Sequence, residues 1–308
     1  MEPSLCLREK RNGVLFMIVA GLTWGTSGTI SRFAPAAAVA QPLTLACARV
    51  LLGGTMLCLL SLACGRGSVF LRSHDALCAG VCSALNQIGF FMAMDSVGVA
   101  LGTMIVIGSS IVMAGLFGAL LGERPRSLWW TAAALGIAGS VLAASGGECM
   151  AFRLDGLFFG LLGGFGYAGI GIFLKRMGRA GLSPTESNGA ALLYGGLILL
   201  PLALRGDLGW LLTARGSLSA LALGLLATAV PYFCFAAALT RISVAQSYAI
   251  SLLEPVTAAL LGVFLLGERL NGVQALGMAL EFACMVLSSW DAVCRADNSA
   301  NAERERTS

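Results

Sequence analysis

The 308-residue chain contains 57% hydrophobic and only 12% charged residues, and its mean hydropathy is +0.84. This composition excludes a soluble single-core protein, because several apolar runs reach the roughly 20 residues that a helix needs to span a bilayer. The runs are continuous rather than alternating, which favours helices over a barrel, and a net charge of +4 without a basic aromatic patch argues against a nucleic-acid partner. We therefore expect an all-α integral membrane protein.

Ten apolar segments follow one another along the chain and are predicted to be transmembrane helices. Their approximate ranges are 13–32, 42–64, 76–94, 97–121, 127–146, 156–174, 187–204, 217–239, 243–266 and 272–291. Residues 1–12 form a short basic N-terminal segment, and residues 292–308 form a polar tail that we expect to be disordered. With the N-terminus inside, fourteen Lys and Arg residues fall on the inner side and five on the outer side. Both termini are therefore predicted to be cytoplasmic.

The fourth and ninth apolar segments are copies of one another. Residues 93–124 and 238–269 agree at eleven aligned positions, and both end with the sequence Leu-Leu-Gly-Glu-Arg. This duplication divides the chain into two five-helix repeats, residues 13–146 and 156–291, joined by an external linker at 147–155. Because each repeat has an odd number of helices, the second must be inserted upside down relative to the first. Inverted repeats are a recurrent plan of secondary transporters, which bind substrate near the midplane between the halves.

Several short motifs resemble the drug/metabolite transporter superfamily, specifically its ten-helix EamA-type members. They are Trp24-Gly25, Arg49, Phe90-Phe91-Met92-Ala93, the Leu-Gly-Glu-Arg that closes the fourth and ninth segments, and Leu253-Glu254-Pro255-Val256. The resemblance implies a proton-coupled or facilitated carrier of small metabolites, often an exporter of amino acids, with no ATPase domain. The sequence departs from the common pattern at Ser109-Ser110, which aligns with Glu254-Pro255, and at Glu281, where such proteins are usually apolar.

Three ionisable residues, Arg49, Glu254 and Glu281, are predicted to lie deep in the bilayer. A charge there costs about 2.5 to 3.5 kcal/mol on insertion scales, so it normally faces a cavity or a partner. Arg49 can bind a substrate carboxylate or merely neutralise one of the two acids. Glu254 is a candidate proton-coupling group or partner of a substrate amine, or else forms a permanent ion pair with Arg49. Glu281 is a second proton-coupling candidate, unless it only serves helix packing or a homodimer contact.

Other candidate substrate-binding residues are aromatic or polar. Trp24 lies on a stripe of glycines and can close over a substrate, although such a residue is also common as an interfacial anchor. The remaining candidates for hydrogen-bonding cavity walls are Asn86, Gln87, Tyr167, Tyr232 and Tyr248. Pro255 lacks a backbone donor, so it either loosens the helix beside Glu254 or produces a harmless kink.

The duplicated helix ends are interpreted as structural. The residues concerned are Glu123, Arg124, Glu268 and Arg269, and each glutamate sits at the entrance of the next helix, where the helix dipole favours an anion. No Ser/His/Asp, Cys/His or metal-spaced set can be assembled within the membrane segments. We therefore predict that the chain has no catalytic residues and binds no metal or cofactor. We also predict that it is not an enzyme.

The leading functional hypothesis is a secondary transporter in the bacterial cytoplasmic membrane that exports amino acids or related small metabolites by alternating access. A multidrug, cation or sugar-derivative carrier of the same fold is the alternative within this class. Outside it, a non-transporting scaffold or an intramembrane lipid-modifying enzyme remains open. A carrier predicts a polar pocket of at least about 300 Å³ between the halves, whereas a scaffold predicts that every buried charge is paired.

Overall fold

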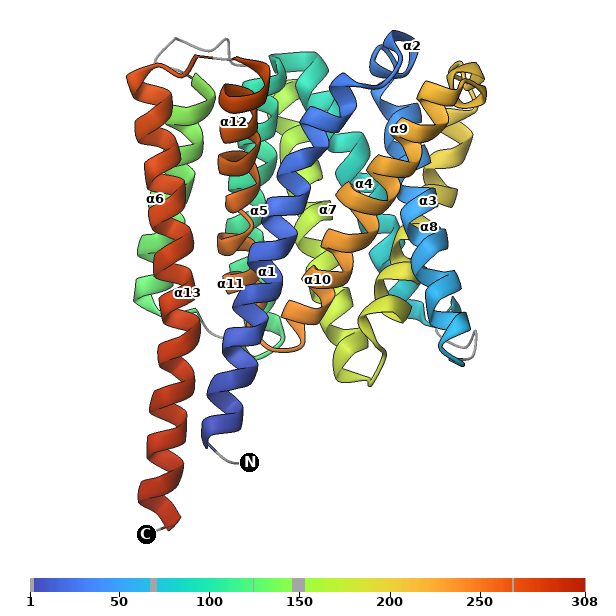
Figure 1. The fold of residues 1–308 in the computed structure, drawn as a ribbon. Coiled ribbons are helices and arrows are strands. Elements are labelled where there is room, and N and C mark those ends of the chain that lie inside the picture. The colour runs from blue at the N-terminus through green and yellow to red at the C-terminus, as the bar shows by residue number, and fades with distance from the viewer. Residues whose placement is uncertain (1–2, 67–70, 124, 146–152, 268, 308) are drawn as a thin grey trace.

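The computed structural model describes residues 3–66, 71–123, 125–145, 153–267 and 269–307, and these ranges contain helices but no strand. The helices stand side by side in one bundle (Figure 1). The first part of the chain forms α1 (Pro3–Arg32), α2 (Ala36–Val39), α3 (Pro42–Ala63), α4 (His74–Val97), α5 (Val99–Leu120) and α6 (Ser127–Ser145). The second part forms α7 (Leu154–Arg179), α8 (Pro184–Ala203), a 3₁₀ turn (Gly209–Leu212), α9 (Ala214–Gly224), a π-helical turn (Leu225–Ala229), α10 (Val230–Leu239), α11 (Val244–Ile250), α12 (Leu253–Leu266) and α13 (Gly272–Thr307).

Within the described residues, nine segments are long and apolar enough to cross a membrane. Two of them, 214–239 and 244–265, each join more than one of these helices. The seventh predicted segment, 187–204, is present as α8, but α8 is not among the nine. Its first turns carry Thr185, Glu186 and Asn188, which lower its hydropathy. The ten-helix count thus stays a prediction.

The ninth predicted segment is interrupted between α11 and α12, next to Glu254. Pro255 has no N–H to donate to the carbonyl of Ser251, and its ring crowds that carbonyl, so a continuous helix is disfavoured there. The Glu254 N–H instead donates to the Ser251 carbonyl at 2.8 Å. As a result Glu254 lies in the first turn of α12, where the helix dipole stabilises negative charge.

Both ends of the chain are more helical than the sequence suggested. The basic N-terminal segment belongs to α1 from Pro3 onward, and the expectation of a disordered tail at 292–308 is wrong as far as Thr307, because α13 continues through it. The alanine, glutamate and arginine residues of this tail are strong helix formers, which explains the continuation. The first turns of α1 and the last turns of α13 project from the same end of the bundle (Figure 1).

Glycines set the close approach of several helix pairs. A Cβ atom on Gly89 of α4 would lie 2.4 Å from the backbone nitrogen of Gly163 on α7, and one on Gly139 of α6 would lie 2.6 Å from the Gly277 carbonyl on α13. Such pairs of small residues are how membrane helices gain packing contacts without a hydrophobic driving force. The first pair fixes α4 against α7, two helices that carry part of the central cavity wall, and the second fixes α6 against α13.

Candidate functional site

A cavity of about 110 Å³ lies in the middle of the bundle, between helices from both parts of the chain. Its wall is built from α1, α3, α4 and α5 on one side and from α7, α10 and α12 on the other. The residues that line it are Trp24, Arg49, Asn86, Gln87, Phe90, Thr103, Val106, Ile107, Tyr167, Tyr232 and Glu254. The cavity is the only described place where Arg49 and Glu254, far apart in the sequence, face the same space.

Six of the seven predicted substrate-binding residues lie on this wall, each from a different helix. They are Trp24, Arg49, Asn86, Tyr167, Tyr232 and Glu254. The seventh, Tyr248, is fully buried behind the wall. Its hydroxyl donates to the backbone carbonyl of Tyr167, and its ring packs edge-on against Tyr167 at 4.8 Å between centroids. Tyr248 therefore supports Tyr167 rather than facing the cavity.

The two charged residues of the cavity are not joined by an ion pair. Arg49 donates through Nη2 to Oε1 of Gln87 at 3.5 Å, and it interacts electrostatically with Glu254 across the cavity. No salt bridge within 4.0 Å links the two side chains in the described part of the chain. Both residues are half-buried, and each keeps hydrogen-bonding capacity that a third molecule can use. A guanidinium and a carboxylate arranged in this way complement the two charges of a zwitterion.

An aromatic cluster forms another part of the wall. Trp24 is only 4% exposed and packs against Tyr232 at 5.2 Å, Phe235 at 5.6 Å and Tyr167 at 6.4 Å between ring centroids. The contacts of Trp24 with Tyr167 and Tyr232 are edge-to-face, and such contacts contribute about 0.5 to 1.5 kcal/mol each beyond burial. The prediction of a polar pocket of at least about 300 Å³ is wrong for this cavity, whose volume is about 110 Å³, because the packed rings fill part of the space. Trp24 joins the core cluster and borders the cavity at the same time.

Asn86 is engaged with the frame of the bundle as well as with the cavity. Its Nδ2 donates to the carbonyl of Gly163 at 3.0 Å, which ties α4 to α7 one turn from Tyr167. The carbonyl of Tyr232 accepts from the side chain of Asn188 on α8. Asn86 and Tyr232 are thereby held in place by hydrogen bonds within the protein, which do not depend on a ligand.

The sequence comparisons identify the class of protein to which this site belongs. The sequence model of the EamA-like transporter family matches twice, at residues 11–145 and 154–290. The chain belongs to the EamA-like transporter family. It is therefore an integral membrane protein and a membrane transporter.

Two individual relatives of this EamA-like transporter are themselves named as transporters. The chain is 36% identical over 270 residues to an uncharacterized transporter, YwfM, of Bacillus subtilis, which covers 86% of this chain and 90% of the relative. It is 24% identical over 295 residues to an uncharacterized inner membrane transporter, YicL, of Salmonella typhimurium, covering 93% and 98%. A protein of known crystal structure shares the fold with a TM-score of 0.76, at 21% identity over 91% of this chain and 98% of that one.

Four wall residues of the EamA-like transporter were missed by the sequence analysis as site residues: Phe90, Thr103, Val106 and Ile107. The last three lie on α5, three and four positions apart, so they share one helix face. Thr103 is the only polar residue among them, and it aligns with Tyr248 in the duplication. That alignment is the one signal that could have marked this face.

The predicted proton-coupling residue Glu281 does not reach the central cavity. It lies on α13 and lines a second cavity, of about 260 Å³, that is bounded by α5, α6, α12 and α13. Its Oε1 accepts a hydrogen bond of 2.7 Å from the hydroxyl of Ser140 on α6. The structure thus separates Glu281 from Glu254, although α12 borders both cavities.

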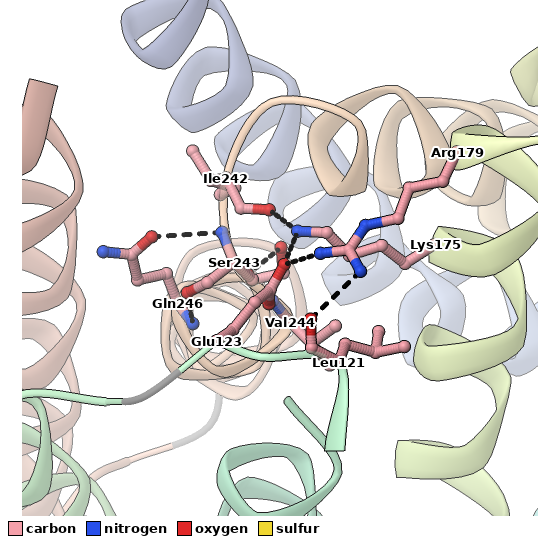
Figure 2. A network of polar contacts seen from close by, with 9 residues as sticks. Leu121, Glu123, Lys175, Arg179, Ile242, Ser243, Val244 and Gln246 are labelled. Atoms are coloured by element: carbon pink, nitrogen blue, oxygen red, sulfur yellow. Dashed lines mark hydrogen bonds and ion pairs between the residues drawn. The ribbon is translucent and has the colours of Figure 1, made fainter. Parts of the chain in front are cut away.

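Glu123 is the centre of a polar network at the end of the bundle that carries both termini (Figures 1 and 2). Its Oε1 lies 2.5 Å from Nζ of Lys175 and 3.1 Å from Nη2 of Arg179, both on α7. Its Oε2 accepts the backbone N–H of Val244 at 2.9 Å, in the first turn of α11. Lys175 also donates to the carbonyl of Ile242 at 2.6 Å. The network joins the end of α5 to α7 and to the α10–α11 connection.

The contacts of Glu123 differ from the ones that its sequence position suggested. The sequence placed Glu123 at the entrance of α6, whereas its carboxylate reaches the first turn of α11 in the second part of the chain. Of the other predicted helix-end residues, Arg269 is exposed in the connection between α12 and α13. Arg124 and Glu268 lie outside the described residues.

Proposed function

We propose that this chain is a secondary transporter of small zwitterionic metabolites, amino acids first among them, which it exports by alternating access. The observation that carries the proposal is the arrangement of Arg49 and Glu254, which face one central cavity without pairing directly. A substrate carboxylate would bind the guanidinium, and a substrate ammonium would bind Glu254. Each of the two buried charges would then have an oppositely charged partner only when substrate is bound.

The size of the cavity supports small substrates. At about 30 Å³ per water molecule, a volume of about 110 Å³ corresponds to roughly four waters, which suits an amino acid with a small side chain. A larger side chain would require the aromatic cluster around Trp24 to move. This movement is a natural part of alternating access, in which the wall of the site opens to one side at a time.

The architecture that we propose is ten membrane helices in two inverted halves, residues 13–146 and 156–291, with 147–155 as the external linker. The double match of one family model and the repeated Leu-Leu-Gly-Glu-Arg ending support the duplication. The tenth span would be α8, which packs against both α3 and α4 inside the bundle. Together with the charge bias of the loops, this proposed count would put both termini in the cytoplasm of a bacterial cell.

Proton coupling would use the carboxyl group of Glu254. It lies at the break between α11 and α12 and borders the cavity, so substrate and proton would compete for the same group. Such competition is the simplest form of exchange, because the carrier crosses loaded with one or the other. Glu281 is a second candidate for proton transfer, in its own cavity.

A scaffold is the competing proposal from a different class, and one observation speaks against it. A protein with no ligand is expected to pair its membrane-buried charges within itself, because an isolated charge there is costly. The network around Glu123 meets this expectation, but the cavity of Arg49 and Glu254 does not. The unpaired arrangement favours a transporter.

The test is counterflow of a labelled amino-acid mixture into liposomes that contain the purified protein, with and without an imposed pH gradient. We expect uptake above that of empty liposomes, a response to the gradient, and loss of both in Glu254→Gln. Arg49→Ala should abolish uptake as well. The matched control is Arg66→Ala, which removes the surface pair with Glu186 and should leave uptake unchanged. Uptake that persists in both cavity variants contradicts the proposed site.

A further inference from the structure

Glu281 has an unsatisfied carboxylate oxygen deep in the bundle. The residue is 2% exposed, and it lies nine residues after Gly272, which at about 1.5 Å per residue places it roughly 14 Å into α13. Its Oε1 is bound by Ser140 at 2.7 Å, whereas Oε2 is buried and has no hydrogen-bond partner among the described residues. A buried polar atom without a partner costs free energy unless a ligand or ion satisfies it.

The cavity beside Glu281 has the composition of a ligand site. Its volume is about 260 Å³, more than twice that of the central cavity and close to the lower limit of about 300 Å³ for ligand pockets. Most of its wall is apolar, from the side chains of Met104, Ile107, Ala143, Ala259 and Met278. Polar atoms come from Glu281 and its neighbours, and no Lys or Arg side chain lines the described wall.

We propose that this cavity is a second binding site, which takes a small organic amine with its ammonium group on Oε2 of Glu281. The apolar part of the amine would lie against the methionine and alanine side chains. An ammonium group has three donors, one of which would satisfy Oε2 of Glu281. An inorganic cation would find too few oxygen ligands on this wall, and a proton alone leaves the apolar volume unexplained.

A ligand in this second site would affect the central cavity, because the two cavities share wall residues. Thr103 and Ile107 line both cavities. Glu254 borders the central cavity and its neighbour Pro255 borders the second one, at the break in the helix. An amine against Pro255 thus packs behind the carboxylate that the central site uses. The second site is distinct from the proposed transport site, and its occupancy can be measured without transport.

The experiment is equilibrium binding of labelled phenethylamine to the full-length protein in phosphatidylcholine nanodiscs. We expect binding with a Kd at or below about 1 mM for the wild type. Glu281→Gln keeps the acceptor for Ser140 and removes the charge, and it should weaken binding at least about tenfold. The matched control Asp75→Asn changes a carboxylate that lines neither cavity and should leave the affinity within about twofold. Glu254→Gln is measured beside it to detect any amine that binds in the central cavity instead. The uncharged analogue 2-phenylethanol should bind at least about tenfold more weakly than the amine.

A second variant keeps the proposal testable should Glu281→Gln fail to fold. Ala143→Leu fills the cavity without changing any charge, and it should also reduce amine binding at least about tenfold. The proposal is overturned by absence of binding in the wild type, by equal binding in the wild type and Ala143→Leu or Glu281→Gln, or by loss of binding only in Glu254→Gln. Equal binding of the amine and the alcohol overturns it too, since the cavity would then take any apolar molecule.

Discussion

The Glu123 cluster and the pair of Arg49 and Glu254 in the central cavity use the same acid–base chemistry in opposite ways. In the Glu123 cluster every charged group has a partner within about 3 Å. The second oxygen of the Glu123 carboxylate accepts a hydrogen bond from the backbone N–H of Val244. In the central cavity, Arg49 and Glu254 face each other without direct contact. Because charge is costly inside a membrane, a paired cluster can serve structure alone, whereas an unpaired one indicates a partner that comes from outside.

The positions of the two clusters sharpen this contrast. The Glu123 cluster links α5 to α7 and α11 at the end of the bundle that carries the termini (Figure 1). To open the central cavity toward that end, α5 and α7 would have to separate and the ion pairs would break. We therefore expect the paired cluster to act as a latch for one state of the transporter, and the unpaired one to hold the substrate.

The largest effect is expected from the groups that contact substrate. For the wild type we predict at least about 100-fold discrimination between an amino acid and its methyl ester, which lacks the carboxylate. In Arg49→Ala this discrimination should fall to within about tenfold, because a lost buried charge partner costs about 2 to 5 kcal/mol. Competition of each compound with equilibrium binding of the labelled amino acid to the purified protein measures it, because this readout does not require uptake by Arg49→Ala. Discrimination that survives in Arg49→Ala would mean that another group binds the carboxylate.

A smaller effect, on stability, is expected from breaking the latch. Glu123→Ala leaves Lys175, whose side chain is 9% exposed, without its ion-pair partner. Removing one member of a buried pair typically costs about 3 to 5 kcal/mol, and we expect about 3 here because Arg179 is half exposed. Thermal unfolding in detergent measures this loss.

The control for the latch is Asp75→Ala, which removes an exposed pair with Arg176. Such surface pairs contribute about 0 to 1 kcal/mol, so its unfolding midpoint should stay near that of the wild type. In Glu123→Ala, a cysteine introduced at Thr103 should also react faster with a reagent supplied from the side of the termini. Equal reactivity and equal stability in the two variants would remove the distinction between the clusters.

The frame that holds both clusters offers a third prediction. Gly89→Ala places a methyl group 2.4 Å from the backbone nitrogen of Gly163, so α4 and α7 must separate. Overpacking of this kind costs about 1 to 3 kcal/mol, and it should disturb both Tyr167 and Lys175, which α7 carries. Gly28→Ala is the matched control, since its new methyl group meets nothing within 4 Å. A lower unfolding midpoint for Gly28→Ala than for Gly89→Ala would contradict this account of the packing.

The smallest effect is expected away from both clusters, at the start of α8. Ser183 accepts the N–H of Glu186, and the Glu186 carboxylate accepts the N–H of Ser183. Ser183→Ala removes this cap and should lower stability by about 1 kcal/mol while counterflow stays unchanged. A large loss of transport in this variant would show that α8 contributes to the site more directly than the structure indicates.

Features that follow from the free-energy cost of a single residue in its own segment could be predicted from the sequence. Arg49 and Glu254 stand out because a charge in an apolar segment needs an explanation wherever the fold places it. Pro255 likewise marks the helix break, because its missing donor is a property of one residue. The repeated Leu-Leu-Gly-Glu-Arg ending relates the fourth segment to the ninth, since finding it needs only a comparison of the chain with itself.

The parts that depend on helix crossings could not be predicted. Nothing local distinguishes Ile107 of the cavity wall from an ordinary core residue, since both are apolar side chains on an apolar helix. Glu281 was grouped with Glu254, but the close crossing of α6 and α13 at Gly139 and Gly277 places it in a separate cavity. The partners of Glu123 come from residues more than 50 positions away, which a helix-end pattern does not contain.

The most direct test of the central claim is equilibrium binding of a labelled small amino acid to the purified protein, compared among the wild type, Arg49→Ala and Glu254→Gln. The account predicts that the wild type binds, that each variant loses at least about 30-fold in affinity, and that Glu123→Gln, which changes the paired cluster, keeps binding. Equal affinities in the wild type and the two cavity variants would contradict the claim that Arg49 and Glu254 bind the substrate.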